Sequence, residues 1–190
     1  MQGHPVSYSQ STLTELMIPA YANFGGKIHG GILLSLMDKV AYVCASKHAG
    51  NYCVTVSVDN VNFLAPAEVG DLVSMIASVN YVGTTSLVVG IRVVAENVQT
   101  GSKRHTNTSY FTMVARTPDG SKAEIPPLIL EGPEEIRRFA SALRRRRLRL
   151  FATERMEEYK SNFTVDDEVR AFLAQERCEI RLRDEGEAAP

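Results

Sequence analysis

The sequence predicts an α+β fold: a long central helix wrapped by a curved antiparallel sheet of about five strands, followed by a helical extension at the C-terminus. Three observations predict it: a helical period over residues 30–47, a two-residue period afterwards, and a change in charge after residue 130. Residues 1–130 carry 8 basic and 8 acidic side chains, whereas residues 131–190 carry 13 and 14. Only the first part is apolar enough for a large core, so we expect a folded domain at 1–130 and a charged extension at 131–190.

The central helix is expected from Gly30 to about Lys47, a stretch without proline. Its apolar residues recur at i, i+3, i+4 and i+7; they are Leu33, Leu36, Met37, Val40 and Cys44. Further apolar residues lie around the rest of its circumference, and Asp38 and Lys39 are its only charges before the last turn. A helix that is apolar on most sides is buried on most sides.

Alternating apolar and polar residues predict strands near residues 12–18, 54–58, 72–81, 85–98 and 102–117. The alternation slips at Asn60, which predicts a bulge or bend there. Thr100 and Gly101 supply the turn before the last strand. Long consecutive strands joined by short turns form an antiparallel sheet. One long helix held by such a curved sheet is the description of a hotdog fold.

Four glycines stand within seven residues just before the central helix: Gly25, Gly26, Gly30 and Gly31. The unpaired N–H groups of a first helical turn, with the positive end of its dipole, stabilise a developing negative oxygen. Such a helix start could hold the oxyanion of a carbonyl under attack. A flexible loop with a tight helix entry explains the same glycines equally well.

Three polar residues of this region also have two interpretations each. Asp38, two turns into the helix, either faces solvent beside Lys39 or is held in a cleft for use. His29 could act as a base, or serve as packing and as a backbone hydrogen-bond partner. Asn23 could orient a water molecule or only form a turn.

A resemblance to a known family lies in the pattern Asn23-(x5)-His29-Gly30-Gly31-(x6)-Asp38. This pattern resembles the signature of the hotdog-fold acyl-CoA thioesterases, the acyl-CoA hydrolase family. The segments 54–63, 66–71, 83–86 and 108–114 are similar to that family too, so the resemblance covers roughly residues 12–118.

The resemblance implies an enzyme that hydrolyses fatty acyl-CoA to free fatty acid and coenzyme A, in a site shared by two subunits. Asp38 would activate water as a general base or attack as a nucleophile, and Asn23 of the other subunit would orient the water or thioester. The Gly31 N–H would polarise the carbonyl. No metal or separate cofactor is expected, because coenzyme A is part of the substrate.

The resemblance also implies residues that contact coenzyme A, namely His29, Gly30, Gly83, Thr84 and Ser86. Lys103 and Arg104, beside a hairpin turn, are added as candidate contacts of its phosphates, although solvated turn charges are an equal explanation. A homodimer is the minimum assembly, and a hexamer of three dimers is expected from the resemblance.

Two other functions suit the same scaffold. One is an acyl-thioester hydratase or dehydratase acting through His29, and the other is a non-catalytic regulator that binds acyl-CoA. Nucleic acid is not expected as a partner, because acidic clusters at 154–158 and 166–168 offset the basic run 144–147. These charges are expected in solvated or intersubunit ion pairs.

The extension is expected to form a helix over residues 133–160 and a second helix capped by Thr164, with residues 185–190 frayed. The three cysteines have no metal-ligand spacing and are expected as free thiols. No secretory signal and no membrane-spanning stretch is recognised, so a cytoplasmic protein is expected.

Overall fold

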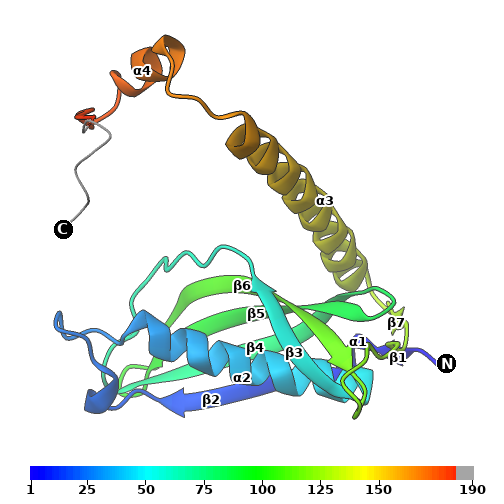
Figure 1. Cartoon of the computed structure of the whole chain (residues 1–190). Helices are drawn as coiled ribbons and strands as arrows, with labels where there is room; N and C mark the ends of the chain where they lie inside the picture. Colours follow the sequence, from blue (N-terminus) through cyan, green and yellow to red (C-terminus); the bar gives the residue numbers. More distant parts are fainter. Residues whose placement is uncertain (183–190) are drawn as a thin grey trace. The chain divides into compact units, whose positions relative to one another are not determined.

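The computed structural model describes residues 1–182, and the chain divides into two compact units, Met1–Arg145 and the residues from Arg146 onward. The first unit holds a five-stranded antiparallel sheet in the order β2-β4-β5-β6-β3, curved around one long helix, α2 (Figure 1). The elements are β2 Ser11–Leu16, α2 Gly30–Ala49, β3 Tyr52–Val58, β4 Asp71–Val82, β5 Ser86–Asn97 and β6 Lys103–Arg116. The predicted hotdog fold is confirmed.

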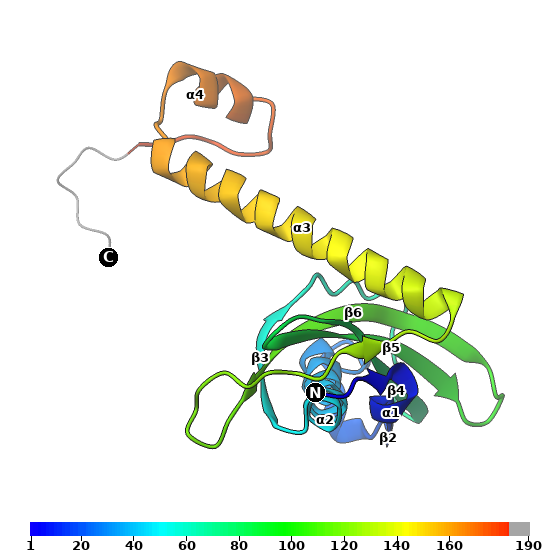
Figure 2. The ribbon, with the colours of Figure 1, turned by 90° about the vertical axis from the view of Figure 1, so that its right-hand side faces the viewer.

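The core lies between the sheet and α2. Figure 2 looks almost along α2 and shows the sheet bending around it. The inward-facing residues of β5 are fully buried, as their alternation predicts; they are Leu87, Val89, Ile91 and Val93. The apolar positions that predicted α2 are buried against them. Gly50, in the left-handed conformation with φ 63°, ends the helix.

Short elements close one end of this unit. Strand β1 (His4–Pro5) pairs in parallel with β7 (Leu128–Ile129), and helix α1 (Val6–Ser9) lies against the C-terminal part of α2. The imidazole of His48, on α2, is fully buried there. Its Nε2 donates to the Pro126 carbonyl at 3.1 Å, and Ser9 Oγ lies 3.4 Å from Nδ1. A short 3-10 helix, η1 (Pro19–Tyr21), follows β2.

The irregularity of β3 is not where the sequence places it. The register against β6 shifts between Thr55 and Ser57, and the strand ends at Val58, so the prediction of a bulge at Asn60 is wrong. Val56 is the extra residue, and its side chain is 53% exposed.

Helix α3 spans Pro133–Asn162 and helix α4 spans Asp167–Leu173. Asp166, rather than the predicted Thr164, caps α4, because its carboxylate accepts the Val169 N–H at 2.9 Å. The division between the two units falls inside α3, and the predicted domain boundary at 130 stays a prediction. Residues 185–190 lie outside the described residues. Within residues 1–182, no helix combines the length and apolar character that crossing a membrane requires.

Candidate active site

Asp38 projects from α2 towards the edge strand β3. Thr55, on β3, donates its hydroxyl hydrogen to Asp38 Oδ1 over 2.6 Å. In a single chain both side chains are exposed. Leu34 and Tyr42, four residues before and after Asp38, share its face of the helix. The carboxylate is therefore held in one orientation while its other oxygen stays open to an incoming molecule.

Two hollows meet at this carboxylate, with volumes of about 470 and 420 Å³. The first is lined by Tyr42, Val43, Tyr52 and Val54, and the second by Leu34, Val58, Val61 and Phe111. Their walls are mostly apolar, so Asp38 is a charged group with apolar surface on both sides. That is the setting of a small-molecule site with few polar groups.

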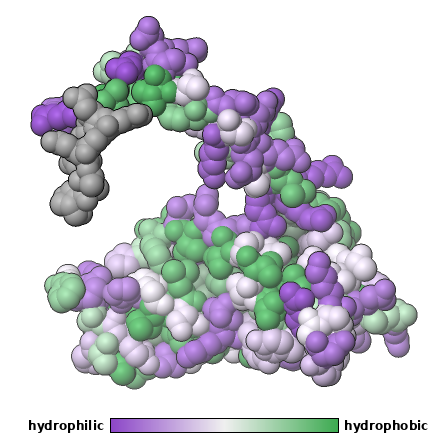
Figure 3. Space-filling model, in the orientation of Figure 1, coloured by the Kyte–Doolittle hydropathy of each residue, from purple (hydrophilic) through white to green (hydrophobic). Residues whose placement is uncertain are grey.

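Strand β3 is one of the two edges of the sheet, since within residues 1–182 it pairs with β6 alone. Tyr52, Val56 and Val58 of this strand are exposed. In Figure 3, hydrophobic side chains gather on the face that carries α2 and β3. An exposed apolar edge strand favours pairing with another chain.

Asn23 forms a turn in the loop before α2. Its Oδ1 accepts the N–H of Gly25 at 2.9 Å and that of Lys27 at 3.1 Å, and its own N–H donates to the Lys27 carbonyl. The side chain is exposed, and its Nδ2 donates to none of residues 1–182. Because the oxygen is engaged, the amide N–H₂ group is the part available to another molecule.

The same loop is fastened to the segment that precedes β4. The Ile28 N–H donates to the Ala67 carbonyl, and Lys27 Nζ pairs with Glu68 at 2.5 Å. The N–H of Glu68 in turn donates to Asp71, a carboxylate that is only 2% exposed. These contacts connect the turn at Asn23 to the end of the sheet.

His29 is the N-cap of α2, and its Nδ1 accepts the Gly31 N–H at 2.9 Å. Of the two interpretations of His29, the structure therefore shows the backbone hydrogen-bond partner. The Gly31 N–H, predicted to polarise a carbonyl, is occupied in this arrangement and becomes free only when the imidazole turns away. A side chain at Gly30 would crowd the Phe63 ring, at 3.3 Å, so glycine lets the loop after β3 approach the helix start.

One chain does not bring Asn23 and Asp38 together. Asp38 lies about 12 Å along the helix axis from Gly30, at a rise of 1.5 Å per residue, while Asn23 lies before the helix start. No hydrogen bond joins the two side chains in residues 1–182.

The predicted coenzyme contacts lie at two ends of the sheet. Gly83, Thr84 and Ser86 form the turn between β4 and β5, and Ser86 lies in register with Val114 of β6, hence with Val54 of β3. This turn is therefore two strands, about 10 Å, from the β3 edge beside Asp38.

Lys103 and Arg104 lie at the far end of β5 and β6, about 30 Å from Ser86 at 3.4 Å per residue. Lys103 pairs with Glu96 at 3.3 Å. Arg104 pairs with Asp71 at 2.5 Å and is 32% exposed. The residues of one chain thus cannot all contact the same phosphate group, and Arg104 already has a carboxylate partner.

Sequence reasoning missed Thr55 as a site residue. It was predicted only as a polar position on an alternating strand, and nothing in that alternation points to Asp38, 17 residues away. The available signal was the expected packing of the central helix against this strand, which places a hydroxyl opposite the helix carboxylate. All three cysteines are free, as expected, and burial raises the pKa of the Cys44 thiol to about 12.

Comparison with known proteins agrees with this geometry. Residues 25–102 match the family model described as the thioesterase superfamily. Protein VdlD of Helicobacter pylori is 45% identical over 72% of this chain and 78% of its own length. A Bacillus subtilis protein described as an uncharacterized acyl-CoA thioester hydrolase, YkhA, is 33% identical over 72% of this chain and 80% of its own.

Solved structures extend the match over most of the chain. The acyl-CoA hydrolase of Bacillus cereus superposes with a TM-score of 0.78 at 32% identity, covering 86% of this chain and 99% of its own. The acyl-CoA hydrolase of Staphylococcus aureus, solved with butyryl coenzyme A and coenzyme A, superposes with a TM-score of 0.73 at 29% identity. The match covers 84% of this chain and 99% of that one.

Three variants of that Staphylococcus aureus enzyme carry alanine in place of an asparagine, an aspartate and a threonine. These three residues are spaced along that chain as Asn23, Asp38 and Thr55 are spaced along this one. With the confirmed fold and relatives matched over most of their length, the chain belongs to the hotdog-fold acyl-CoA thioesterase family, whose members are thioester hydrolases.

Proposed function

We propose that this protein hydrolyses fatty acyl-CoA to free fatty acid and coenzyme A, in a site that two copies of the chain form together. The observation that carries the proposal is the Asp38 carboxylate, fixed by Thr55 at the open sheet edge between two apolar hollows. The hollows suit an acyl chain, and the carboxylate suits attack on the thioester carbon beside it. The free cysteines and a relative named as a cytosolic enzyme support a cytoplasmic setting.

The second copy would pair through β3. Its edge carries exposed apolar side chains, and pairing two such edges would bury them while satisfying the free backbone groups. In the proposed site, the Asn23 loop of the partner subunit would lie opposite Asp38. One solved neighbour is described as a hexameric acyl-CoA thioesterase, which supports a trimer of such dimers.

In the proposed reaction, Asp38 either takes a proton from water, whose oxygen attacks the thioester carbon, or attacks that carbon itself to form an anhydride that water then cleaves. In both routes the carbon–sulfur bond breaks, the thiolate leaves as coenzyme A, and the acyl group leaves as a carboxylic acid. Thr55 keeps one carboxylate oxygen in place so that the other faces the substrate.

Donors for the developing oxyanion come from the loop before the helix. The Asn23 amide N–H₂ of the partner would donate to the water or the carbonyl, since its oxygen is held in the turn. The Gly31 N–H would donate once the His29 imidazole turns away from it. A positioned base contributes about 10²–10⁴-fold to such a reaction.

The first test is thiol release from saturated acyl-CoA of several chain lengths, which hydration of a double bond cannot produce. We expect Asp38→Asn to lower kcat at least about a hundredfold with the fold intact by circular dichroism. Asp119→Asn, an exposed carboxylate in the turn after β6, is the matched control and should keep normal turnover. Normal turnover of Asp38→Asn, or acyl-CoA binding without turnover by the wild-type protein, would contradict the proposal.

The shared site has its own test, which uses two inactive variants. Asp38→Asn and Asn23→Ala chains, unfolded and refolded together, form mixed dimers in which one of the two sites has both wild-type groups. Random pairing then restores roughly a quarter of wild-type activity. If the mixture stays as inactive as its components, both groups act within one chain.

A further inference from the structure

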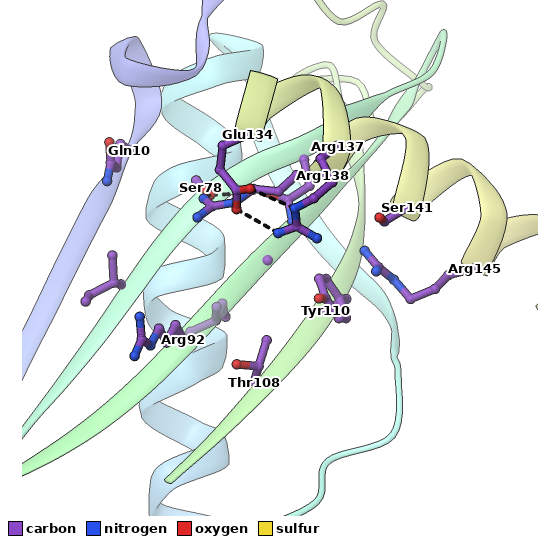
Figure 4. Close-up of a pocket in the computed structure, with 14 residues that line it drawn as sticks. Gln10, Ser78, Arg92, Thr108, Tyr110, Glu134, Arg137, Arg138, Ser141 and Arg145 are labelled. Carbon is purple, nitrogen blue, oxygen red and sulfur yellow. Dashed lines mark hydrogen bonds and ion pairs between the residues drawn. The ribbon is translucent and has the colours of Figure 1, made fainter. Parts of the chain in front are cut away.

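A third cavity opens on the face of the sheet opposite α2. Its volume is about 580 Å³, its floor is formed by β4, β5 and β6, and its wall is the first part of α3 (Figure 4). All lining residues belong to the unit Met1–Arg145. Asp38 and the apolar hollows lie on the other face, so the thioester carbon attacked in the proposed reaction does not lie in this cavity.

Arginines dominate the lining. Arg92 comes from β5, and Arg137, Arg138 and Arg145 come from α3, whereas Glu134 is the only acidic side chain that the described part of the chain contributes. The Glu134 carboxylate accepts from Arg137 at 2.7 Å and from Arg138 at 2.9 Å, and these two neighbours lower its pKa to about 2. Arg92 and Arg145 have no carboxylate partner in residues 1–182. The cavity wall thus carries an excess of positive charge that would attract an anion.

Arg145 has donors without acceptors. The Cζ atom of its guanidinium lies over the Tyr110 ring, 3.4 Å from the ring centre, which holds the group against the ring face. Its Nε and Nη2 atoms are buried and have no hydrogen-bond partner. A buried donor left unpaired is costly, and this pair of N–H groups is the edge that binds carboxylates and phosphates in bidentate fashion. Turning the guanidinium on the ring towards the cavity would present both donors to a ligand.

The floor beneath the arginines is polar and already oriented. Ser78 Oγ lies 3.4 Å from Arg138 Nη1 and donates to Asn80 Oδ1 at 3.2 Å. Gly90 leaves the space that the Asn80 amide occupies, since a side chain there would collide with it. Hydroxyls of Ser141 and Thr108 also line the cavity, so its donors surround the space from several directions.

We propose that this cavity binds a phosphate-class oxyanion, namely a diphosphate or phosphomonoester group, with Arg145 as its main contact. The planar guanidinium of an arginine on an aromatic ring, surrounded by further arginines and hydroxyls, matches two oxygens of such a tetrahedral, multiply charged group. The cavity is larger than one phosphate, so the anion would carry a second phosphate or an organic substituent. The phosphate can belong to a free metabolite or to the coenzyme itself.

The test is isothermal titration calorimetry of the full-length chain with inorganic pyrophosphate at low salt. We expect binding that weakens as sodium chloride is raised. Arg145→Gln should weaken it at least about tenfold, and Arg145→Lys nearly as much, because lysine keeps the charge without the bidentate edge. Arg144→Gln, the neighbouring exposed arginine outside the lining, is the matched control and should bind within twofold of wild type.

Further titrations identify the source of the phosphate. If Arg145→Gln weakens binding of coenzyme A as much as that of pyrophosphate, the coenzyme is the source; if only pyrophosphate and ADP are affected, it is a free metabolite. Asp38→Asn should bind pyrophosphate like the wild type, which separates this proposal from the catalytic one. Absence of pyrophosphate binding, or equal binding by Arg145→Gln, would overturn it. A third outcome would also overturn it: the wild-type chain does not bind pyrophosphate, and Arg145→Gln lowers the mass of the oligomer. The arginines would then pair with carboxylates of another copy of the chain.

Discussion

Replacing Thr55 by valine removes one hydroxyl at nearly constant volume and tests how Asp38 is oriented. The hydrogen bond is short, 2.6 Å, and its acceptor is a carboxylate. A hydrogen bond to a charged group contributes about 1.5–3 kcal/mol. If the lost hydrogen bond raises the activation free energy of the reaction by this whole amount, kcat falls about 10–100-fold, because about 1.4 kcal/mol corresponds to a factor of ten in rate. Because both groups are exposed in the single chain, the cost in stability should stay below about 1 kcal/mol.

The assay is thiol release from a saturated acyl-CoA, with kcat and KM determined separately and thermal unfolding measured alongside. Thr55→Ser keeps the hydroxyl and should lose little activity. Thr14→Val, on the opposite edge strand where the Thr14 hydroxyl lies 3.1 Å from Ser74 Oγ, is the control for exchanging an exposed strand threonine. A Thr55→Val enzyme with kcat within twofold of wild type, beside an inactive Asp38→Asn enzyme, would refute this role of the hydrogen bond.

Two further predictions concern stability. Asp71→Asn keeps the side-chain shape and an acceptor for the Glu68 N–H, but it leaves Arg104 without its carboxylate partner. We expect the free energy of unfolding in urea to fall by about 2–3 kcal/mol. This loss is smaller than that for a fully buried pair, because Arg104 is 32% exposed. An unchanged urea midpoint would mean that the ion pair is not stabilising. Burial lowers the pKa of His48, so the folded chain binds fewer protons at this residue than the unfolded chain. Stability should hold above about pH 6.5 and fall as the pH drops below it, and His48→Gln should flatten that dependence; an identical pH profile in the variant would assign it to other groups.

The elements of this fold could be predicted because each has a strong local period. Helix α2 and strands β4 to β6 follow directly from their buried positions, and the structure moves their ends by only a few residues. The bulge at Val56 could not be predicted in this way, since it arises from pairing with β6 and leaves the local alternation unchanged. The predicted cap of α4, Thr164, is wrong because the helix begins after Asp166, whose carboxylate accepts the Val169 N–H, and only the backbone geometry decides where the helix begins.

The candidate site was predictable in its residue types and not in its contacts. The resemblance to the family singled out Asn23 and Asp38, for which the residues alone left two interpretations each, whereas the contact between Thr55 and Asp38 is found only in the folded structure. The occupied Gly31 N–H shows the same limit, because the alternative that His29 bonds the backbone could be named but not chosen from sequence. Contacts between elements distant in the chain depend on the folded geometry.

The fastening of the Asn23 loop has a consequence for heterogeneous populations of this protein. Lys27, Glu68 and Asp71 hold that loop within their own chain, yet in the proposed dimer the loop serves the neighbour's reaction. A chain whose loop is damaged would then impair the reaction at its partner's Asp38, while its own Asp38 would still be served by the partner's intact loop, so each mixed dimer would keep one of its two proposed sites.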